Sequence, residues 1–223
     1  MDYNQYRNDI REAVKTSRWK YLREKNNSYF NPKMNTLLSD YLGAIFPDIT
    51  DWVYDKQVDK NILLERGATS IRKYRPDVRS ESLDMIIEFD GLPHFQSASV
   101  ILKDIERNQY FDSIGYTTIR IPYFIQLSSE NINHYFSINT NNVFCEHHYS
   151  FFDSPNDDFG FDISPQMFCC MGMNRFINLL RSLPDSTKHY IKNDLDLVSS
   201  ANQYGISSIP DAYRHEYQRA LSA

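Results

Sequence analysis

A strand, a helix and another strand follow one another within about 40 residues, and this order restricts the fold of the 223-residue chain more than any other feature. Residues 83–89 are apolar and β-branched, and they stop at Asp90 and Gly91. Residues 97–114 place apolar side chains at helical spacing and are followed by Gly115, which suits the end of a helix. Residues 116–121 again resemble a strand. The order predicts a right-handed βαβ unit with parallel strands.

The residues before this unit predict a helix and a hairpin. Met34–Ile45 has the spacing of an amphipathic helix, and residues 52–58 have strand character. Residues 60–70 are predicted as a connection that includes a short strand at 62–64. Residues 70–79 are extended and pair with the next strand through a polar turn. The predicted class is therefore α/β, with an αβββαβ core whose mixed sheet is flanked by helices.

Further helices are predicted at both ends of the chain. Residues 3–24 show helical spacing. Ser164 and Pro165 form a cap and first-turn pair that opens a helix ending at Pro184. The residues after it predict two short helices, separated by Gly205 and Pro210. We divide the chain into an N-terminal helical segment (1–30), an α/β core (31–139) and a mostly helical C-terminal extension (140–223).

Composition predicts a soluble, cytoplasmic protein that does not enter a membrane. No apolar run reaches the roughly 18 to 20 residues of a membrane span, and the first residues lack the apolar stretch of a secretory signal. Three cysteines are an odd number, which suits a reducing compartment. Cys145 lies near His147 and His148, which suggests a zinc site. This spacing matches no standard zinc motif, however, and a free cysteine is commonly a small buried apolar residue.

The net charge of −5 is unfavourable for a nucleic-acid-binding protein, but it is unevenly distributed. Residues 1–139 carry 18 Lys and Arg against 19 Asp and Glu (net −1), and residues 140–223 carry 6 against 10 (net −4). Two basic clusters could follow a phosphate backbone, or could equally be a solvated helix face and a polar strand edge. Their members are Arg7, Arg11, Lys15, Arg18, Lys20, Arg23 and Lys25, and then Arg66, Arg72, Lys73, Arg75 and Arg79.

Three carboxylates are predicted to converge at one end of the sheet. Glu88 and Asp90 are two residues apart on a strand, so their side chains leave the same face. Asp77 lies on the other arm of the hairpin. Carboxylates this close repel one another unless a cation neutralises them, and oxygen ligands favour Mg²⁺ or Mn²⁺. The alternative is that Asp77 and Glu88 are surface charges, although the apolar neighbours of Glu88 indicate burial.

The same residues belong to an ordered series of short motifs along roughly residues 35–125. The series comprises Arg75-Pro76-Asp77, Ile87-Glu88-Phe89-Asp90-Gly91, His94, Asp104, Arg107, Gly115, Tyr116 and Thr118-Ile119-Arg120-Ile121-Pro122. It resembles the PD-(D/E)xK nuclease superfamily and is most similar to the group related to very-short-patch-repair endonucleases. That group typically shows an acidic-x-Asp-Gly-x-x-His run, a D-x-x-R helix, a glycine and a strand ending in an arginine.

The resemblance implies a restriction-endonuclease-like core and an enzyme, a Mg²⁺-dependent (or Mn²⁺-dependent) endonuclease. A metal-activated water would hydrolyse phosphodiester bonds of DNA, in a restriction, repair or phage-defence system. Asp77 and Glu88 would be metal ligands, helped by the backbone carbonyl of Phe89. Asp90 stands where the superfamily usually has a lysine. An aspartate cannot supply that positive charge, but it could bind a second metal.

The catalytic role of the missing lysine would pass to other residues. His94 has an ordinary pKa near 6.5, which suits a general base, or it could simply be a polar turn residue. Arg107 or Lys103, on the following helix, could stabilise transition-state charge. Arg107 could instead form an ion pair with Asp104 or Asp90.

Contacts with nucleic acid are expected from Lys73, Arg75, Lys103 and Arg120. Arg120 would orient a phosphate or a carboxylate, or would cap the end of its strand. Asp40 is the only acidic residue on the predicted first core helix, where the superfamily often has one.

A second hypothesis is a degenerate nuclease fold that binds nucleic acid or a partner protein without cutting. The Asp90 departure and the acidic C-terminal extension motivate it. The Phe/Met-rich helix of this extension could dock onto another subunit or form a homodimer, although packing into the core explains the same residues.

Overall fold

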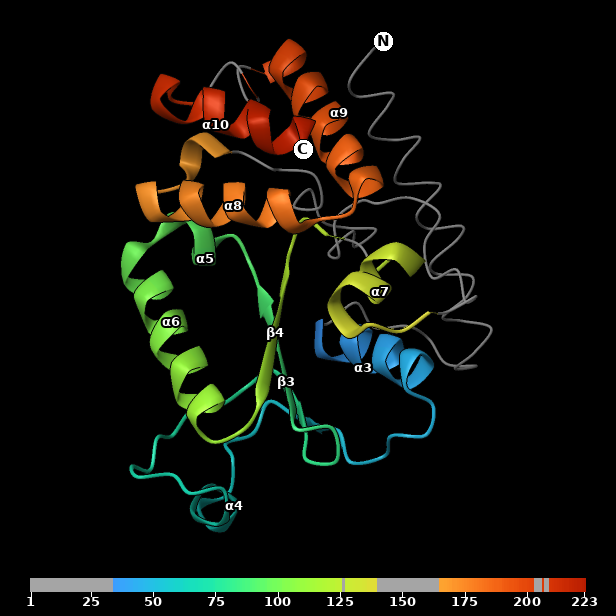
Figure 1. The fold of residues 1–223 in the computed structure, drawn as a ribbon, viewed down its shortest axis with the longest axis vertical. Helices are drawn as coiled ribbons and strands as arrows, with labels where there is room; N and C mark the ends of the chain where they lie inside the picture. Colours follow the sequence, from blue (N-terminus) through green and yellow to red (C-terminus); the bar gives the residue numbers. More distant parts are fainter. Residues whose placement is uncertain (1–33, 126, 140–164, 203–205, 207–208) are drawn as a thin grey trace.

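A computed structural model describes residues 34–125, 127–139, 165–202, 206 and 209–223 (Figure 1). The predicted helix at residues 3–24, the first basic cluster and the three residues considered for zinc (Cys145, His147 and His148) lie outside these ranges.

Four strands form one mixed sheet in the order β1-β2-β3-β4. The first three, β1 (Val53–Tyr54), β2 (Val78–Ser80) and β3 (Met85–Asp90), pair antiparallel. β3 then pairs in parallel with β4 (Thr117–Pro122). The predicted hairpin and the predicted parallel βαβ unit are both confirmed.

Helices cover both faces of this sheet, as Figure 1 shows for α3 (Met34–Ile45) and α6 (Ala98–Ser113) on opposite sides of β3 and β4. Alternate residues of β3 point to opposite faces. Ile87 belongs to the core cluster that contains the buried residues of α3, whereas Ile86 packs in a second cluster with Phe111 of α6. The described part of the chain is therefore a mixed α/β protein with a four-stranded mixed sheet flanked by helices, and two short helices, one between β1 and β2 and one after β3, interrupt the predicted order of helix, three strands, helix and strand.

The predicted short strand at residues 62–64 is wrong, because α4 (Lys60–Glu65) occupies this segment. The Asp59 side chain caps the helix by accepting a hydrogen bond from the Asn61 N–H at 2.7 Å. A short apolar run has no clear period, so a helix and a strand are hard to distinguish there. The aspartate cap was the signal that favoured a helix.

The other differences concern the length of elements. The predicted strand at residues 52–58 is reduced to β1, and Asp55, which follows it, has a positive φ of 50°. The predicted extended segment at 70–79 is regular only where β2 begins. A short helix, α5 (Pro93–Gln96), follows β3 where only a turn was expected. Gly115 has a φ of 83°, as its predicted place after a helix requires.

The C-terminal part of the chain is helical, as predicted, but is divided differently. The predicted single helix up to Pro184 is a 3₁₀ turn, η3 (Pro165–Met167), followed by α8 (Cys170–Ser182) with Cys169 as its N-cap. The next helix, α9 (Asp185–Asn202), has 18 residues and is not short. It is followed by α10 (Asp211–Ser222), and α7 (Ser129–Phe136) packs near α3 (Figure 1). Among these described helices, none combines the length and apolar character needed to cross a membrane.

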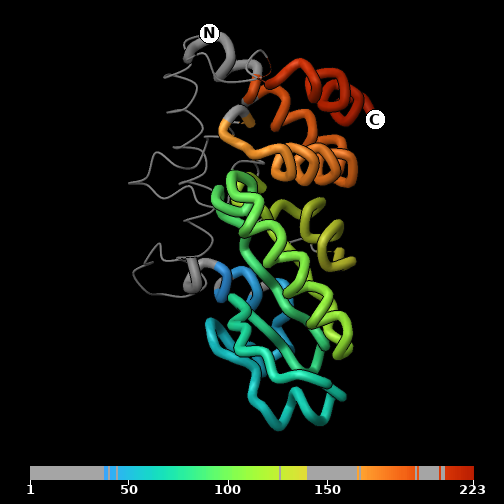
Figure 2. Tube along the Cα trace, turned by 90° about the vertical axis from the view of Figure 1, so that its left-hand side faces the viewer, coloured from blue at the N-terminus to red at the C-terminus, as the bar shows by residue number. Residues whose placement is uncertain are grey.

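Helices α8, α9 and α10 gather at one end of the molecule, next to α5 and far from α4 (Figures 1 and 2). Their apolar side chains share one core cluster with α3 and the sheet, and this cluster includes Phe168, Met173 and Phe176. Phe95 of α5 is fully buried and stacks on Phe168 with ring centroids 5.1 Å apart. The Phe/Met-rich helix therefore packs into the core, which is the alternative that its composition left open.

Gly172 sets the distance between α8 and α5. A Cβ atom on this glycine would lie 1.7 Å from the Phe95 carbonyl oxygen and 2.6 Å from its carbonyl carbon. The same carbonyl accepts a hydrogen bond from the Cys169 N–H at 3.2 Å. The two backbones are thus in direct contact, and no side chain fits between them.

We predict that Gly172→Ala lowers the free energy of unfolding by at least about 2 kcal/mol, because the added methyl group overlaps backbone that cannot move aside. Gly43→Ala is the matched control. Gly43 lies in α3, is exposed, and has no atom within 4 Å of an added Cβ, so this change should add about 0.5–1 kcal/mol through helix propensity. Urea denaturation of both variants measures the difference, and equal stabilities would contradict the close packing at Gly172.

Candidate active site

The hairpin of β2 and β3 places Asp77 opposite Glu88. Val78 pairs with Ile87, and continuing this antiparallel register by one residue gives the pair Asp77 and Glu88. Residues opposite each other in such a pair point to the same face of the sheet. The Asp77 carboxylate also accepts a hydrogen bond from the Phe89 N–H at 2.7 Å, which holds it against the end of β3.

Glu88 is buried, with 4% of its surface exposed, and faces α6. Its Oε1 accepts a hydrogen bond from Nη1 of Arg107 at 2.9 Å. Burial raises the pKa of Glu88 from its ordinary value of 4.5 to about 7; the charge of Arg107 opposes this rise, and the charge of Asp77 adds to it. The partner of Arg107 is therefore Glu88, and not Asp104 or Asp90 as the sequence suggested.

The pKa of Asp77 is raised as well. Burial is the largest cause, the Phe89 N–H and the charge of Arg107 oppose it, and the charge of Asp90 adds to it. Asp77 and Glu88 thus both hold protons more tightly than free carboxyl groups do. Burial is the main cause of both shifts, and carboxyl groups perturbed in this way are common at functional sites.

Asp90 lies in a different environment, although it is only two residues beyond Glu88. It is 2% exposed, and its Oδ1 forms an ion pair with Arg120 and lies 3.4 Å from Nδ1 of His94. Its Oδ2 lies 3.6 Å from Nη1 of Arg175. Both carboxylate oxygens therefore already have cationic partners.

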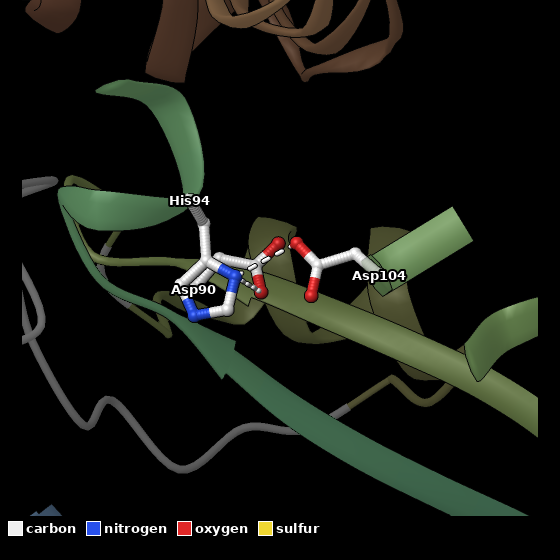
Figure 3. Close-up of side chains that lie close together, drawn as sticks. All are labelled: Asp90, His94 and Asp104. Atoms are coloured by element: carbon white, nitrogen blue, oxygen red, sulfur yellow. Dashed lines mark hydrogen bonds and ion pairs between the residues drawn. The ribbon is translucent and has the colours of Figure 1, made fainter. Parts of the chain in front are cut away.

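Asp104, on α6, joins the same group of charges, in which its carboxylate, that of Asp90 and the ring of His94 face one another (Figure 3). Asp104 Oδ2 lies 2.8 Å from His94 Nδ1 and 2.9 Å from Arg175 Nη1, while Oδ1 accepts from Arg120 Nη2 at 3.1 Å. We call Asp90, His94, Asp104, Arg120 and Arg175 the charge cluster.

The charge cluster shifts the pKa values of Asp104 and His94. Burial would raise the pKa of Asp104, but the hydrogen bond from His94, the charge of Arg120 and the hydrogen bond from Arg175 outweigh it and lower that pKa. Burial would likewise lower the pKa of His94, but the hydrogen bond to Asp104 and the charges of Asp90 and Asp104 raise it. Within the described residues, every recorded polar contact of the His94 ring is made by Nδ1, so Nε2 faces away from this cluster.

A set of possible metal ligands exists in the described residues, but it differs from the predicted one. Asp90, His94 and Asp104 have donor atoms within 4.8 Å of one another, and no other group of three or more His, Cys, Asp or Glu in the described ranges meets this limit. The two arginines already neutralise these carboxylates, so the set does not fit an added divalent cation. Asp77 and Glu88 fit better, because the only cationic side chain bonded to this pair in the described part of the chain is Arg107, which contacts Glu88.

The residues expected to contact nucleic acid lie in unequal positions. Lys73 and Lys103 are exposed. Arg75 is also exposed but forms an ion pair with Asp55 at 2.7 Å. Arg120 is half-buried in the charge cluster, so the structure shows the alternative in which it orients carboxylates. Asp40 falls within α3, and its side chain is not among those described.

The residue that the sequence did not reveal is Arg175. It lies 81 positions from His94, on a helix whose role could not be inferred, and it belongs to no motif. The sequence identified Asp104 as the first residue of the D-x-x-R run, but it predicted only an ion pair with Arg107 for this residue. A charge at a core-facing position of an apolar helix was the available signal for Arg175, since such charges need a buried partner.

Comparisons of the chain with models of known protein families, with curated proteins and with solved structures found no match.

We predict a specific pH dependence of stability for Glu88→Gln in metal-free buffer. As the pH rises from about 4.5 to about 7, the unfolded chain releases the Glu88 proton while the folded protein keeps it, so the wild type loses up to about 3 kcal/mol of stability. Glutamine cannot titrate, and the variant avoids this loss. The stability of Glu88→Gln relative to wild type should therefore increase across this pH range.

Urea denaturation between pH 4.5 and 8 measures this relative stability. The ion pair with Arg107 forms only as Glu88 ionises, so its effect is already contained in the folded-state pKa of Glu88 and needs no separate correction. The control is Asp112→Asn. Asp112 is an exposed carboxylate on α6, the helix that packs over Glu88, and its replacement should follow the wild-type curve. Parallel curves for wild type and Glu88→Gln would show that burial does not raise the pKa of Glu88.

Proposed function

We propose that this protein is a Mg²⁺-dependent endonuclease that hydrolyses phosphodiester bonds of DNA, with Asp77 and Glu88 at its active site. One observation carries the proposal: the register of the β2–β3 hairpin, continued by one residue, brings Asp77 opposite Glu88, where Asp77 accepts a hydrogen bond from the Phe89 N–H and burial raises the pKa of both carboxyl groups. The order of elements agrees with the αβββαβ core of the PD-(D/E)xK superfamily that the motifs resemble. The resemblance would place such an enzyme in a restriction, repair or phage-defence system.

The donor chemistry of this pair fits a small divalent cation. Both side chains offer carboxylate oxygens, the ligands that Mg²⁺ and Mn²⁺ prefer, and the backbone carbonyl of Phe89 is a further oxygen nearby in the chain. A cation held there would polarise a phosphoryl oxygen and lower the pKa of a bound water. Asp90 would not be a third ligand in this arrangement, because Arg120, His94 and Arg175 already surround it.

Positive charge next to the carboxylate pair would come from α6. Arg107 contacts Glu88 and keeps 28% of its side chain exposed, so it can also approach a phosphate. Lys103 is exposed four residues earlier and therefore lies on the same side of the helix. Lys73 is exposed on the segment that leads to Asp77. In this proposal Arg107, with Lys103 and Lys73 as further contacts for phosphate, compensates for the lysine that Asp90 replaces.

His94 would handle a proton in this proposal. Asp104 binds its Nδ1, which leaves Nε2 as the nitrogen able to exchange a proton with a water or a leaving oxygen. Its side chain is 26% exposed, so solvent reaches the ring.

The proposal predicts that Asp77→Asn or Glu88→Gln reduces cleavage of supercoiled plasmid DNA with Mg²⁺ by more than about 100-fold, because the several kcal/mol of charge stabilisation that a bound cation supplies would be lost. Asp112→Asn is the control and should cleave at the wild-type rate. Substrates should include single-stranded, double-stranded, mismatched and modified DNA, and RNA. Wild-type cleavage rates in both site variants would rule out this active site.

A degenerate module that binds nucleic acid or a partner protein without cutting is the second candidate. The specific observation in its favour is that Asp90 replaces the expected lysine and is bound to arginines. Titration with Mn²⁺ separates the two candidates. An active site should bind the ion in the wild type and lose it in Asp77→Asn, whereas a degenerate module should bind DNA or protein without any Mn²⁺ dependence.

A further inference from the structure

We propose that Arg175, on α8, is a positioning residue for the proposed active site: it holds His94 in the orientation that proton transfer requires. The inference rests on the proposed function for its role in catalysis. The contact between Arg175 and His94 can be tested separately.

Arg175 contacts the cluster through one nitrogen. Its Nη1 donates to the backbone carbonyl of His94 at 3.0 Å and to Oδ2 of Asp104 at 2.9 Å, and it lies 3.6 Å from Oδ2 of Asp90. The side chain is 16% exposed. One guanidinium group therefore links the backbone of His94 to the carboxylate that binds its ring.

His94 and Arg175 bind the same oxygen of Asp104, so Arg175 helps to set the direction in which this carboxylate faces the ring. Oδ2 of Asp104 binds both Nδ1 of His94 and Nη1 of Arg175, while Oδ1 is held by Arg120. Donors on both oxygens fix the carboxylate plane. Without Arg175, Arg120 would still hold Oδ1, but nothing else in the described residues donates to Oδ2 except the histidine that Asp104 is meant to orient.

The helix that carries His94 cannot hold this geometry alone. α5 has four residues, and Leu92 at its N-terminus provides no side-chain cap. Phe95 of α5 packs against Tyr123 and Phe124, and α8 supports the backbone of α5 through the Cys169 N–H bond to Phe95 and the close approach of Gly172. Arg175 is one helical turn after Gly172, so the position of α8 determines where its guanidinium group lies.

The test compares Arg175→Ala and Arg175→Lys with Asn174→Ala. Asn174 is the exposed neighbour on the same helix, so its replacement controls for any change in α8. Three quantities are measured: the single-turnover rate of DNA cleavage with saturating Mg²⁺, the affinity for DNA, and the ¹⁵N signals of the His94 ring. The ring signals are assigned by their loss in His94→Gln.

For Arg175→Ala we expect a cleavage rate about 10- to 100-fold below wild type with unchanged DNA affinity, the usual size of effect for a residue that orients a site residue. The His94 ring signals should shift as the bond to Asp104 loosens. Guanidinium added at concentrations too low to unfold the protein should restore both the rate and the signals. Arg175→Lys should be intermediate, and Asn174→Ala should match wild type.

Unchanged His94 signals in both Arg175 variants would overturn the inference, whatever happens to the rate. If Arg175→Ala does not fold, Arg175→Lys gives the same comparison. If the wild-type protein cleaves no substrate, the proposed function fails, and the ring signals alone then decide whether Arg175 positions His94. A slower rate that guanidinium does not restore would also count against positioning.

Discussion

The pairing of two buried carboxylates with two arginines is the constraint on which the arrangement of this molecule depends. Asp90 and Asp104 are almost completely removed from water, and a buried charge without a partner is strongly destabilising. Their partners come from separate elements, Arg120 from β4 and Arg175 from α8. β3, α6, β4 and α8 each supply one member of this group, so the loss of any one of them weakens the charge compensation of the others.

The charge cluster also separates two carboxylates that the sequence places together. Glu88 and Asp90 leave the same face of one strand, yet Asp90 is compensated by arginines and Glu88 has a pKa raised to about 7. Both residues are buried, and they differ in their partners, which are Arg107 for Glu88 and Arg120 with Arg175 for Asp90. Asp90 thus has the environment of a structural ion pair. Asp77 and Glu88 lie outside this ion-pair group, and they are the residues that we propose as ligands of a cation.

Local patterns predicted the parts of the fold that local interactions determine. The apolar run ending at Asp90, the helix before Gly115 and the strand after it have strong periodicity, and each lies within a few residues of its predicted bounds. The segment at 62–64 was mistaken because three apolar residues carry no period, and the cap at Asp59 decided the outcome. The alignment of Asp77 with Glu88 follows from the hairpin. The partners of Asp90 did not follow, because Arg175 reaches it from a distant helix and no short-range pattern records such a contact.

The separation of 81 residues between His94 and Arg175 has a consequence for the order of events during synthesis. Contacts between residues close in sequence form early, whereas a contact across such a long loop must await its second partner. The hairpin with Asp77 and Glu88 can form as soon as β3 has left the ribosome. His94 reaches its final orientation only after α8 has followed. A growing chain would thus carry the carboxylate pair without an oriented histidine, and full assembly of the site would coincide with the closing of the C-terminal helices over α5.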